Sequence, residues 1–315
     1  MDFSLSEEQQ AIAELAGRIL EEQVDRRRAW DELAKANLLG LCLPDDVGGS
    51  GYGLVEACLM FEQAGRTVAP VPLVSTLVSA MAVAEWGTPE QRERWLPAVA
   101  SGEVTLTADV DGTRAQVPYA DLAAAVVLVD DDSVRIVDTG DCTLTRQEAT
   151  SGEPQFQVDD AGAGDRMGGT QASVWIRQRW TVALCALQVG VTERALHLTA
   201  EYVAGRHQFE RPIGSFQAVG QRLADAYIDT EAMRLTMWQA AWRLAEGLPS
   251  EEEVAIAKFW ASDGGQRVVA AAQHLHGGIG VALDYPLHRY TLLAKQVELT
   301  LGSGTPQLAA LGEML

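Results

Sequence analysis

Residues able to hold a diphosphate follow one another at the end of a long apolar segment. Arg206 is followed by Gln208 and Phe209, and Gln217 comes soon after. A guanidinium offers a fork of N–H donors that suits paired phosphate oxygens, amide side chains donate further hydrogen bonds, and a phenylalanine offers an apolar face to a ring. These residue types predict a nucleotide site. The structural alternative is that Arg206 only caps its helix against the helix dipole.

A second stretch of the same kind lies nearer the C-terminus and reads His274-Leu275-His276-Gly277-Gly278-Ile279-Gly280. Glycines let a backbone approach another molecule closely with free N–H groups, although they also simply make turns. His274 and His276 are two residues apart, which does not place both on one helix face, and no third ligand is near. We therefore expect no metal here.

Long helices are predicted to position these groups. Apolar periodicity predicts helices over 182–203, 217–246, 251–275 and 285–301, so Arg206, Gln217 and His274 lie at or near helix ends. The first hundred residues are also helical by pattern, with Ser6 and Gln9 as a capping box. Short β-branched runs between them predict strands. We expect an N-terminal helical domain (1–104), a shortened β-domain (105–170) and a C-terminal helical bundle (171–315).

Composition narrows the possible partners. The chain has 315 residues, 47% of them hydrophobic, and a formal net charge of −20, so nucleic acid and anionic membrane are not expected partners. Four scattered cysteines without CxxC spacing indicate reduced, buried thiols. The N-terminus lacks the basic and apolar regions of a signal peptide, and no apolar run is long enough to span a membrane. We expect a cytoplasmic protein.

Three stretches together resemble the acyl-CoA dehydrogenase family. The first runs over 43–51 with 87–91 and 94–97, the second is the Arg206 to Gln217 segment, and the third is the His274 to Gly280 segment with Tyr285-Pro286. The resemblance implies a helical domain, a β-domain and a four-helix bundle, mainly α overall. It also implies FAD, oxidation of an acyl-CoA thioester to the 2-enoyl-CoA with a glutamate as base, and electron delivery to an electron-transfer flavoprotein.

In this family the second and third stretches reach across a dimer interface to the neighbour's FAD. The resemblance therefore implies that the cofactor-binding residues here are Arg206, Gln208, Phe209, Gln217, His274, Leu275, His276, Gly277 and Gly278.

The chain departs from the family where its own active site would lie. Ser303 and Trp180 occupy the two positions at which the family places its base, and neither is a carboxylate. The signatures that cradle a subunit's own flavin are missing from the short β-domain. His274 replaces a usual Gln, and Glu210 a usual Gly. We predict no catalytic residue in this chain.

This pattern resembles the degenerate subunit of heteromeric α2β2 acyl-CoA dehydrogenases of actinobacterial steroid side-chain degradation. We therefore predict a non-catalytic subunit that shares the FAD of a catalytic partner subunit acting on a bulky acyl-CoA. Two alternatives stay open. One is a self-sufficient enzyme with a relocated base, for which Glu298 and Asp284 are candidates. The other is a non-enzymatic scaffold or acyl-CoA-binding module.

Overall fold

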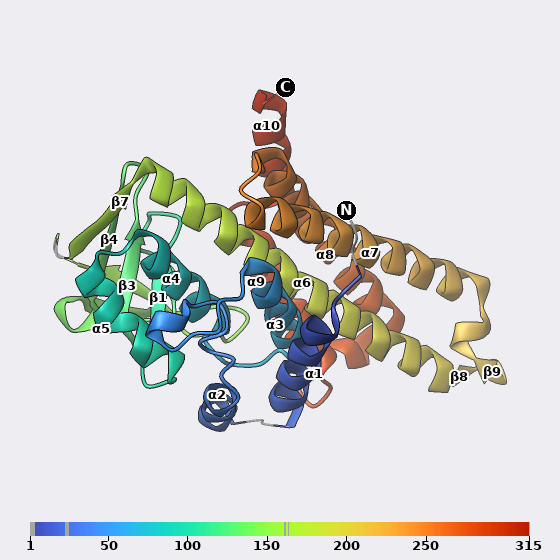
Figure 1. Ribbon diagram of the computed structural model, residues 1–315. Coiled ribbons are helices and arrows are strands. Elements are labelled where there is room, and N and C mark those ends of the chain that lie inside the picture. The colour runs from blue at the N-terminus through green and yellow to red at the C-terminus, as the bar shows by residue number, and fades with distance from the viewer. Residues whose placement is uncertain (1–3, 23–24, 161, 163, 315) are drawn as a thin grey trace. The chain divides into compact units, whose positions relative to one another are not determined.

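A computed structural model describes residues 4–22, 25–160, 162 and 164–314 of the chain. Helices come first, short strands follow, and long helices complete the chain, as the colours of Figure 1 trace from blue to red. The predicted fold class, mainly α with a small β insert, is confirmed.

The N-terminal helices begin with the predicted cap. The Gln9 N–H donates to the Ser6 hydroxyl (3.2 Å), and the Ser6 N–H donates to the Gln9 side chain (3.0 Å). Thr88 and Gln91 form a second capping box. The elements are α1 Glu7–Glu22, α2 Arg26–Lys35, the 3-10 turn η1 Asp45–Val47, α3 Leu54–Thr67, α4 Leu73–Trp86 and α5 Pro89–Ala100.

The strands form two small sheets that share a core. In the first sheet β1 pairs with β3 in parallel, and β3–β4 and β4–β7 are antiparallel; the second sheet has the order β2–β6–β5. Val126 and Leu128 of β3 pack against Val117, Phe156 and Val158 of the second sheet. The elements are β1 Thr105–Asp109, β2 Val117–Pro118, β3 Ala123–Val129, β4 Ser133–Asp138, the 3-10 turn η2 Thr139–Asp141, β5 Thr143–Gln147, β6 Gln155–Asp159 and β7 Asp165–Gly169.

The C-terminal part is a bundle of long helices in which α7 runs alongside α8, and α8 also packs against α9 and α10 (Figure 1). The Gln188 amide of α6 donates to the carbonyls of Ala261 (3.1 Å) and Ala294 (3.4 Å), which ties α6 to α8 and α9. The elements are α6 Thr170–Gly205, β8 His207–Gln208, β9 Arg211–Pro212, the 3-10 turn η3 Ile213–Ser215, α7 Gln217–Ala245, α8 Glu251–His276, the 3-10 turn η4 Gly277–Val281, α9 Leu287–Leu299 and α10 Gly304–Met314.

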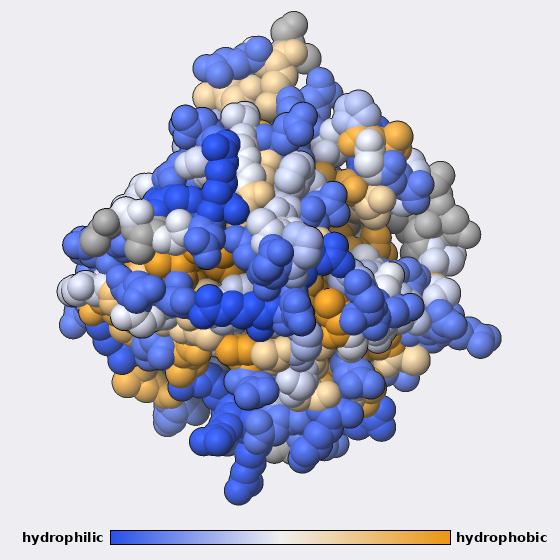
Figure 2. Space-filling model, turned by 60° about the vertical axis from the view of Figure 1, so that its left-hand side comes forward, coloured by the Kyte–Doolittle hydropathy of each residue, from blue (hydrophilic) through white to orange (hydrophobic). Residues whose placement is uncertain are grey.

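The chain divides into two compact units. The first comprises residues 1–61 and 69–183, and the second comprises 62–68 and 184–315, so α3 and α6 contribute to both. The predicted boundaries at 104 and 170 coincide with the change from helix to strand and back, and the three-domain division itself stays a prediction. Hydrophilic residues cover much of the face shown in Figure 2, with smaller hydrophobic groups between them.

Candidate functional site

The predicted arginine segment forms an exposed hairpin at the end of α6. His207 pairs with Pro212 and Gln208 with Arg211, and the two turn residues between them, Phe209 and Glu210, have φ of 51° and 63°. Positive φ at both central residues is the geometry of a type I′ hairpin turn, which normally favours Gly or Asn. The turn therefore projects Phe209 outward, and 86% of that side chain is exposed.

The cations of this hairpin are available to a ligand. Arg206 and Arg211 are both exposed, and no described residue forms an ion pair with either guanidinium. The Arg211 guanidinium lies over the Phe216 ring, 4.1 Å from its centroid. Phe216 is the N-cap of α7, and Gln217 begins that helix with its side chain exposed. The partly positive N-terminus of a long helix therefore adds to the field of the arginines.

The predicted glycine turn is open as well. It is the 3-10 turn η4, which begins at Gly277 with φ of 65°, and it follows the last residue of α8. A Cβ added at Gly277 or Gly278 would meet no atom within 4 Å. The Gln273 amide donates to the Gly277 carbonyl (3.1 Å), which holds the start of the turn. Free space beside an exposed backbone is what close approach of a nucleotide requires.

An aromatic cluster brings the hairpin and the glycine turn to the same end of the bundle. Tyr202 of α6 stacks on His276 of α8 with ring centroids 4.4 Å apart, and Tyr285 contacts both rings. The Arg206 N–H donates to the Tyr202 carbonyl (2.8 Å), and Gly277 follows His276 directly. Sequence reasoning did not identify Tyr202 as part of this site, and its spacing of one helical turn from Arg206 was the available signal.

His276 occupies a different environment from the other predicted residues. It is buried, its Nδ1 donates to the Ala272 carbonyl (2.8 Å), and its Nε2 lies 2.9 Å from the Tyr285 hydroxyl. Burial lowers the pKa of the imidazole, so the ring is neutral at pH 7. His276 therefore supports the turn from below, whereas His274 is exposed and Leu275 is half-buried.

Neither predicted base position holds a carboxylate. Ser303 lies in the turn between α9 and α10, in the second unit, and Trp180 is buried in α6, in the first unit. Beside Trp180, the Arg179 guanidinium stacks on Trp175 at 3.7 Å, and burial lowers the pKa of Arg179 to about 10. An arginine cannot act as a base while it remains protonated at pH 7.

The two alternative bases, Glu298 and Asp284, both belong to the second unit. The Glu298 carboxylate forms an ion pair with Lys295 (2.5 Å) in the last turns of α9, and its side chain is largely buried. Asp284 is exposed on the segment between η4 and α9. The ion pair with Lys295 occupies one of the two carboxylate oxygens of Glu298.

A buried lysine secures the segment that ends at Ser303. Lys258 of α8 is fully buried, and its Nζ donates to the carbonyls of Val297 (2.7 Å) and Glu298 (3.2 Å) and to the Ser262 hydroxyl (3.0 Å). The two carbonyls belong to the last turn of α9, where a positive charge also meets the negative end of the helix dipole. Lys258 was not predicted from the sequence.

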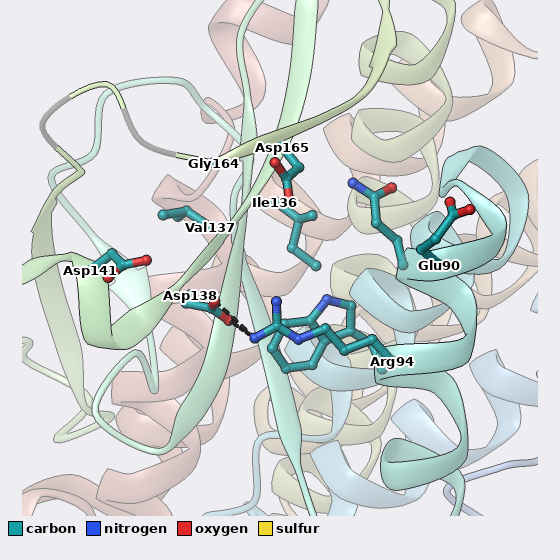
Figure 3. A pocket seen from close by; sticks show the side chains of 10 residues that line it. Glu90, Arg94, Ile136, Val137, Asp138, Asp141, Gly164 and Asp165 are labelled. Carbon is teal, nitrogen blue, oxygen red and sulfur yellow. Dashed lines mark hydrogen bonds and ion pairs between the residues drawn. The ribbon is translucent and has the colours of Figure 1, made fainter.

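A separate pocket of about 260 Å³ lies in the first unit, between α5 and strands β4 and β7. Figure 3 shows Arg94 pointing toward Asp138, with which it forms a two-pronged ion pair of 2.7 and 2.9 Å. Glu90, Asp141 and Asp165 add further negative charge around the cavity. None of the predicted cofactor residues lines this pocket.

The part of the chain that the structure describes contains neither a metal-binding cluster nor a membrane-spanning helix. No group of His, Cys, Asp or Glu there is arranged to hold a metal ion. No helix within those residues has the length and apolar character needed to cross a membrane.

Comparison with known proteins gives matches along most of the chain. Residues 6–103 match the acyl-CoA dehydrogenase N-terminal domain, and residues 177–315 match the acyl-CoA dehydrogenase C-terminal domain. The acyl-CoA dehydrogenase FadE27 of Mycobacterium tuberculosis is 38% identical over 368 aligned positions, which cover 100% of this chain and 99% of that protein. FadE28 of the same organism is 29% identical, with 99% and 98% covered.

Solved structures agree. The ChsE4-ChsE5 complex from Mycobacterium tuberculosis superposes with a TM-score of 0.94 at 36% identity, covering 99% of this chain and 98% of that chain. A variant of the Tcur3481-Tcur3483 steroid acyl-CoA dehydrogenase gives 0.89 at 38% identity, with the same coverage. Butyryl-CoA dehydrogenase from Megasphaera elsdenii, at 24% identity and a TM-score of 0.87, has the same fold. The chain therefore belongs to the acyl-CoA dehydrogenase family.

Proposed function

We propose that this chain is the non-catalytic subunit of a heteromeric, FAD-dependent acyl-CoA dehydrogenase, assembled as an α2β2 tetramer with a catalytic subunit. One observation carries the proposal. The Arg206 hairpin and the Gly277 turn present free donors and open space to another molecule, while Ser303 and Trp180 leave both base positions without a carboxylate. The chain therefore contributes to the partner's cofactor site and leaves proton abstraction to the partner.

The residues at the end of the bundle fit FAD. The exposed guanidinium of Arg206 would bind the diphosphate, with Gln208 and Gln217 as further donors, and the Phe209 ring would pack against a flat part of the cofactor. His274 and the backbone at Gly277 and Gly278 would approach it from the second stretch, with Leu275 and His276 supporting the turn. When bound, FAD supplies the acceptor for the hydride that leaves the acyl chain.

The low acidity of the α-proton explains why the partner subunit must supply the catalytic base. A thioester α-carbon loses its proton only to a positioned base whose pKa is matched to the task, and a serine hydroxyl is protonated far above neutral pH. Ser303 does not meet this requirement. Glu298 remains the alternative base, and its ion pair with Lys295 counts against that role.

Two comparisons support the assembly and the substrate class. The ChsE4-ChsE5 and Tcur3481-Tcur3483 proteins are each named for two different chains, and the second is a steroid acyl-CoA dehydrogenase. We therefore propose a bulky, steroid-derived acyl-CoA as the substrate of the complex. We also propose that an electron-transfer flavoprotein accepts the electrons and that the complex works in the cytoplasm.

Chain length gives further support. The alignment with FadE27 spans 368 positions, whereas this chain has 315 residues, so FadE27 contains dozens of residues that this chain lacks. The interval between the two family matches, 104–176, contains the whole β-rich part. A shortened β-domain there agrees with a chain that does not build a flavin pocket of its own.

The test is the flavin content of purified protein. The chain is produced alone and together with a complete acyl-CoA dehydrogenase as its partner, and protein-bound FAD is measured by absorbance and by mass spectrometry. We expect a colourless chain when it is produced alone and one FAD per two chains in the complex. A yellow, self-sufficient chain that desaturates an acyl-CoA would overturn the proposal.

A further inference from the structure

The loop that carries the glycine turn is closed by a side-chain hydrogen bond between its two ends. The Nε2 of His276 lies 2.9 Å from the Tyr285 hydroxyl, and the turn η4, Gly277–Val281, lies between these two residues. Because the Nδ1 of the neutral His276 ring donates to the Ala272 carbonyl (2.8 Å), its Nε2 is the acceptor and the Tyr285 hydroxyl is the donor. The bond therefore ties the start of the loop to its end.

The side chains of this loop contribute little packing. Ile279, Val281 and Leu283 are 43%, 64% and 86% exposed. Two backbone hydrogen bonds lead along the loop, from the Ala282 N–H to the Ile279 carbonyl and from the Tyr285 N–H to the Ala282 carbonyl, both of 3.1 Å. A segment with few buried contacts opens easily unless its ends are held, because open conformations are favoured by entropy. The conformation of the turn therefore depends on where Tyr285 is held.

Tyr285 is held in turn by the start of α9. The Nδ1 of His288 lies 2.7 Å from the Tyr285 carbonyl. Two residues further, Tyr290 is buried and its hydroxyl donates to the Arg66 carbonyl of α3 (2.8 Å), within the same compact unit. Tyr285 thus connects an exposed loop to a helix that is anchored in the core of the second unit.

The same ring cluster reaches the arginine hairpin. Tyr202 stacks on His276 with ring centroids 4.4 Å apart, and its ring meets that of Tyr285 edge-on at 6.4 Å. The Arg206 N–H donates to the Tyr202 carbonyl (2.8 Å). A displacement of the His276 ring would therefore disturb the hairpin as well as the glycine turn.

We propose that Tyr285 is a positioning residue of the cofactor site. Its hydroxyl fixes the ring of His276, and His276 fixes both the Gly277 turn and the ring of Tyr202. The inference rests on the proposed function, since the group that these segments address is the FAD held with the partner subunit. Tyr285 acts on FAD through its neighbours, without touching the cofactor.

Removal of a single oxygen atom tests this role. Tyr285→Phe keeps the ring contacts and deletes only the hydroxyl, and FAD is titrated into the flavin-free complex of this chain with its catalytic partner. We expect FAD affinity, measured by fluorescence, to weaken by about threefold to tenfold, as for the loss of one neutral hydrogen bond. The matched control is Tyr290→Phe, which also loses one hydroxyl hydrogen bond but leaves the loop closed, so its FAD affinity should equal that of the wild type.

Hydrogen exchange of the chain alone gives a readout that needs no FAD. The amides of residues 277–285 should exchange about threefold faster in Tyr285→Phe than in the wild type, because the loop opens more often. In Tyr290→Phe they should exchange at the wild-type rate. Equal exchange of this loop in the two variants, whatever their thermal stability, would show a purely structural role and overturn the inference.

Arg206→Glu separates a failure of this inference from a failure of the proposed function. If Arg206→Glu weakens FAD binding and Tyr285→Phe does not, the positioning role of Tyr285 is wrong and the proposed function stands. If neither change alters FAD affinity, both are wrong.

Discussion

Arginines in two regions of the molecule differ in what they contact. In the first unit, Arg94 of α5 pairs with Asp138, Arg135 of β4 with Asp160, and Arg177 of α6 with Asp131. In the second unit, by contrast, Arg206 and Arg211 lie exposed at the end of the bundle without an ion pair to any described residue. These three ion pairs stabilise the first unit itself, whereas Arg206 and Arg211 at the end of the bundle are available to another molecule.

This comparison explains how an acidic chain can still bind an anionic cofactor. The first unit carries most of the net charge of −20, and the second is nearly balanced. Charges that are exposed and far apart are screened by salt within about 10 Å, so the local field at the hairpin depends on its own arginines and on the start of α7. Substitutions in the two units should therefore affect different properties.

The largest expected effect is on the stability of the first unit. Arg114 pairs with Asp109 and with Asp130 (2.8 Å), and the Asp109 side chain is 2% exposed. Burial raises the pKa of Asp109 to about 6. Arg114→Met removes the partner of a buried carboxylate, and we expect a loss of about 3 kcal/mol in the free energy of unfolding, measured with urea.

The matched control for that change is Arg94→Met, which breaks a more exposed pair with Asp138. We expect it to cost less than about 1 kcal/mol. Both variants should leave the FAD content of the complex unchanged. If Arg114→Met protein remains folded but the complex loses FAD, the claim that this ion pair of the first unit affects stability and not FAD binding would be wrong.

An intermediate effect concerns the one fully buried lysine of the second unit. Burial lowers the pKa of Lys258 to about 8, below the value of about 10.4 expected in the unfolded chain. Between these values the unfolded chain binds more protons than the folded one, so stability rises with pH. From pH 8 to pH 10 we expect the wild-type chain to gain about 2 kcal/mol relative to Lys258→Met.

Urea unfolding of both proteins at the two pH values measures this difference. Lys258→Met keeps the volume of the side chain and removes the titrating group, so pH effects elsewhere in the chain cancel. Parallel pH profiles for the two proteins would show that Lys258 stays charged in the folded chain, with its three hydrogen bonds compensating for burial.

The smallest expected effect concerns the hairpin turn. Glu210 has φ of 63°, a conformation that costs a residue with a Cβ about 1 kcal/mol and glycine almost nothing. Glu210→Gly should therefore stabilise the chain by up to about 1 kcal/mol, measured by thermal unfolding. Glu210→Ala removes the charge and keeps the strain, so it should not stabilise. Both variants should tighten FAD binding, and equal stability of the two would contradict the role of φ.

Sequence patterns predict most reliably those elements that are bounded by residues such as proline and glycine or that form an uninterrupted apolar run. Helix α4, Leu73–Trp86, lies between Pro72 and Gly87, residue types that end helices, and β3, Ala123–Val129, is an uninterrupted apolar run. Strand β5, Thr143–Gln147, was not predicted because its side chains are mainly exposed and lack an apolar alternation. Helix α10 was not predicted because Gly302, Gly304 and Pro306 interrupt its start.

Only those parts of the candidate cofactor site that are local sequence motifs could be predicted. Arg206 and the glycine turn could be recognised because each is a local motif at a helix end. The stacking of Tyr202 on His276, which holds the two motifs together, joins residues that are far apart in the sequence. The same limit applies to Lys258, whose acceptors are carbonyls of another helix. Contacts of this kind follow from packing and leave no periodic signal in the sequence.

The central claim is that this chain contributes Arg206 to a flavin held mainly by another chain, and one measurement tests it most directly. FAD affinity is measured for the complex that contains Arg206→Glu, beside a complex that contains Arg146→Glu, a charge reversal at an exposed arginine of β5. We expect Arg206→Glu to weaken FAD binding by about tenfold to a hundredfold, since a charge-assisted hydrogen bond is worth about 1.5–3 kcal/mol. Arg146→Glu should have no effect. Equal FAD affinity in the two complexes would contradict the account.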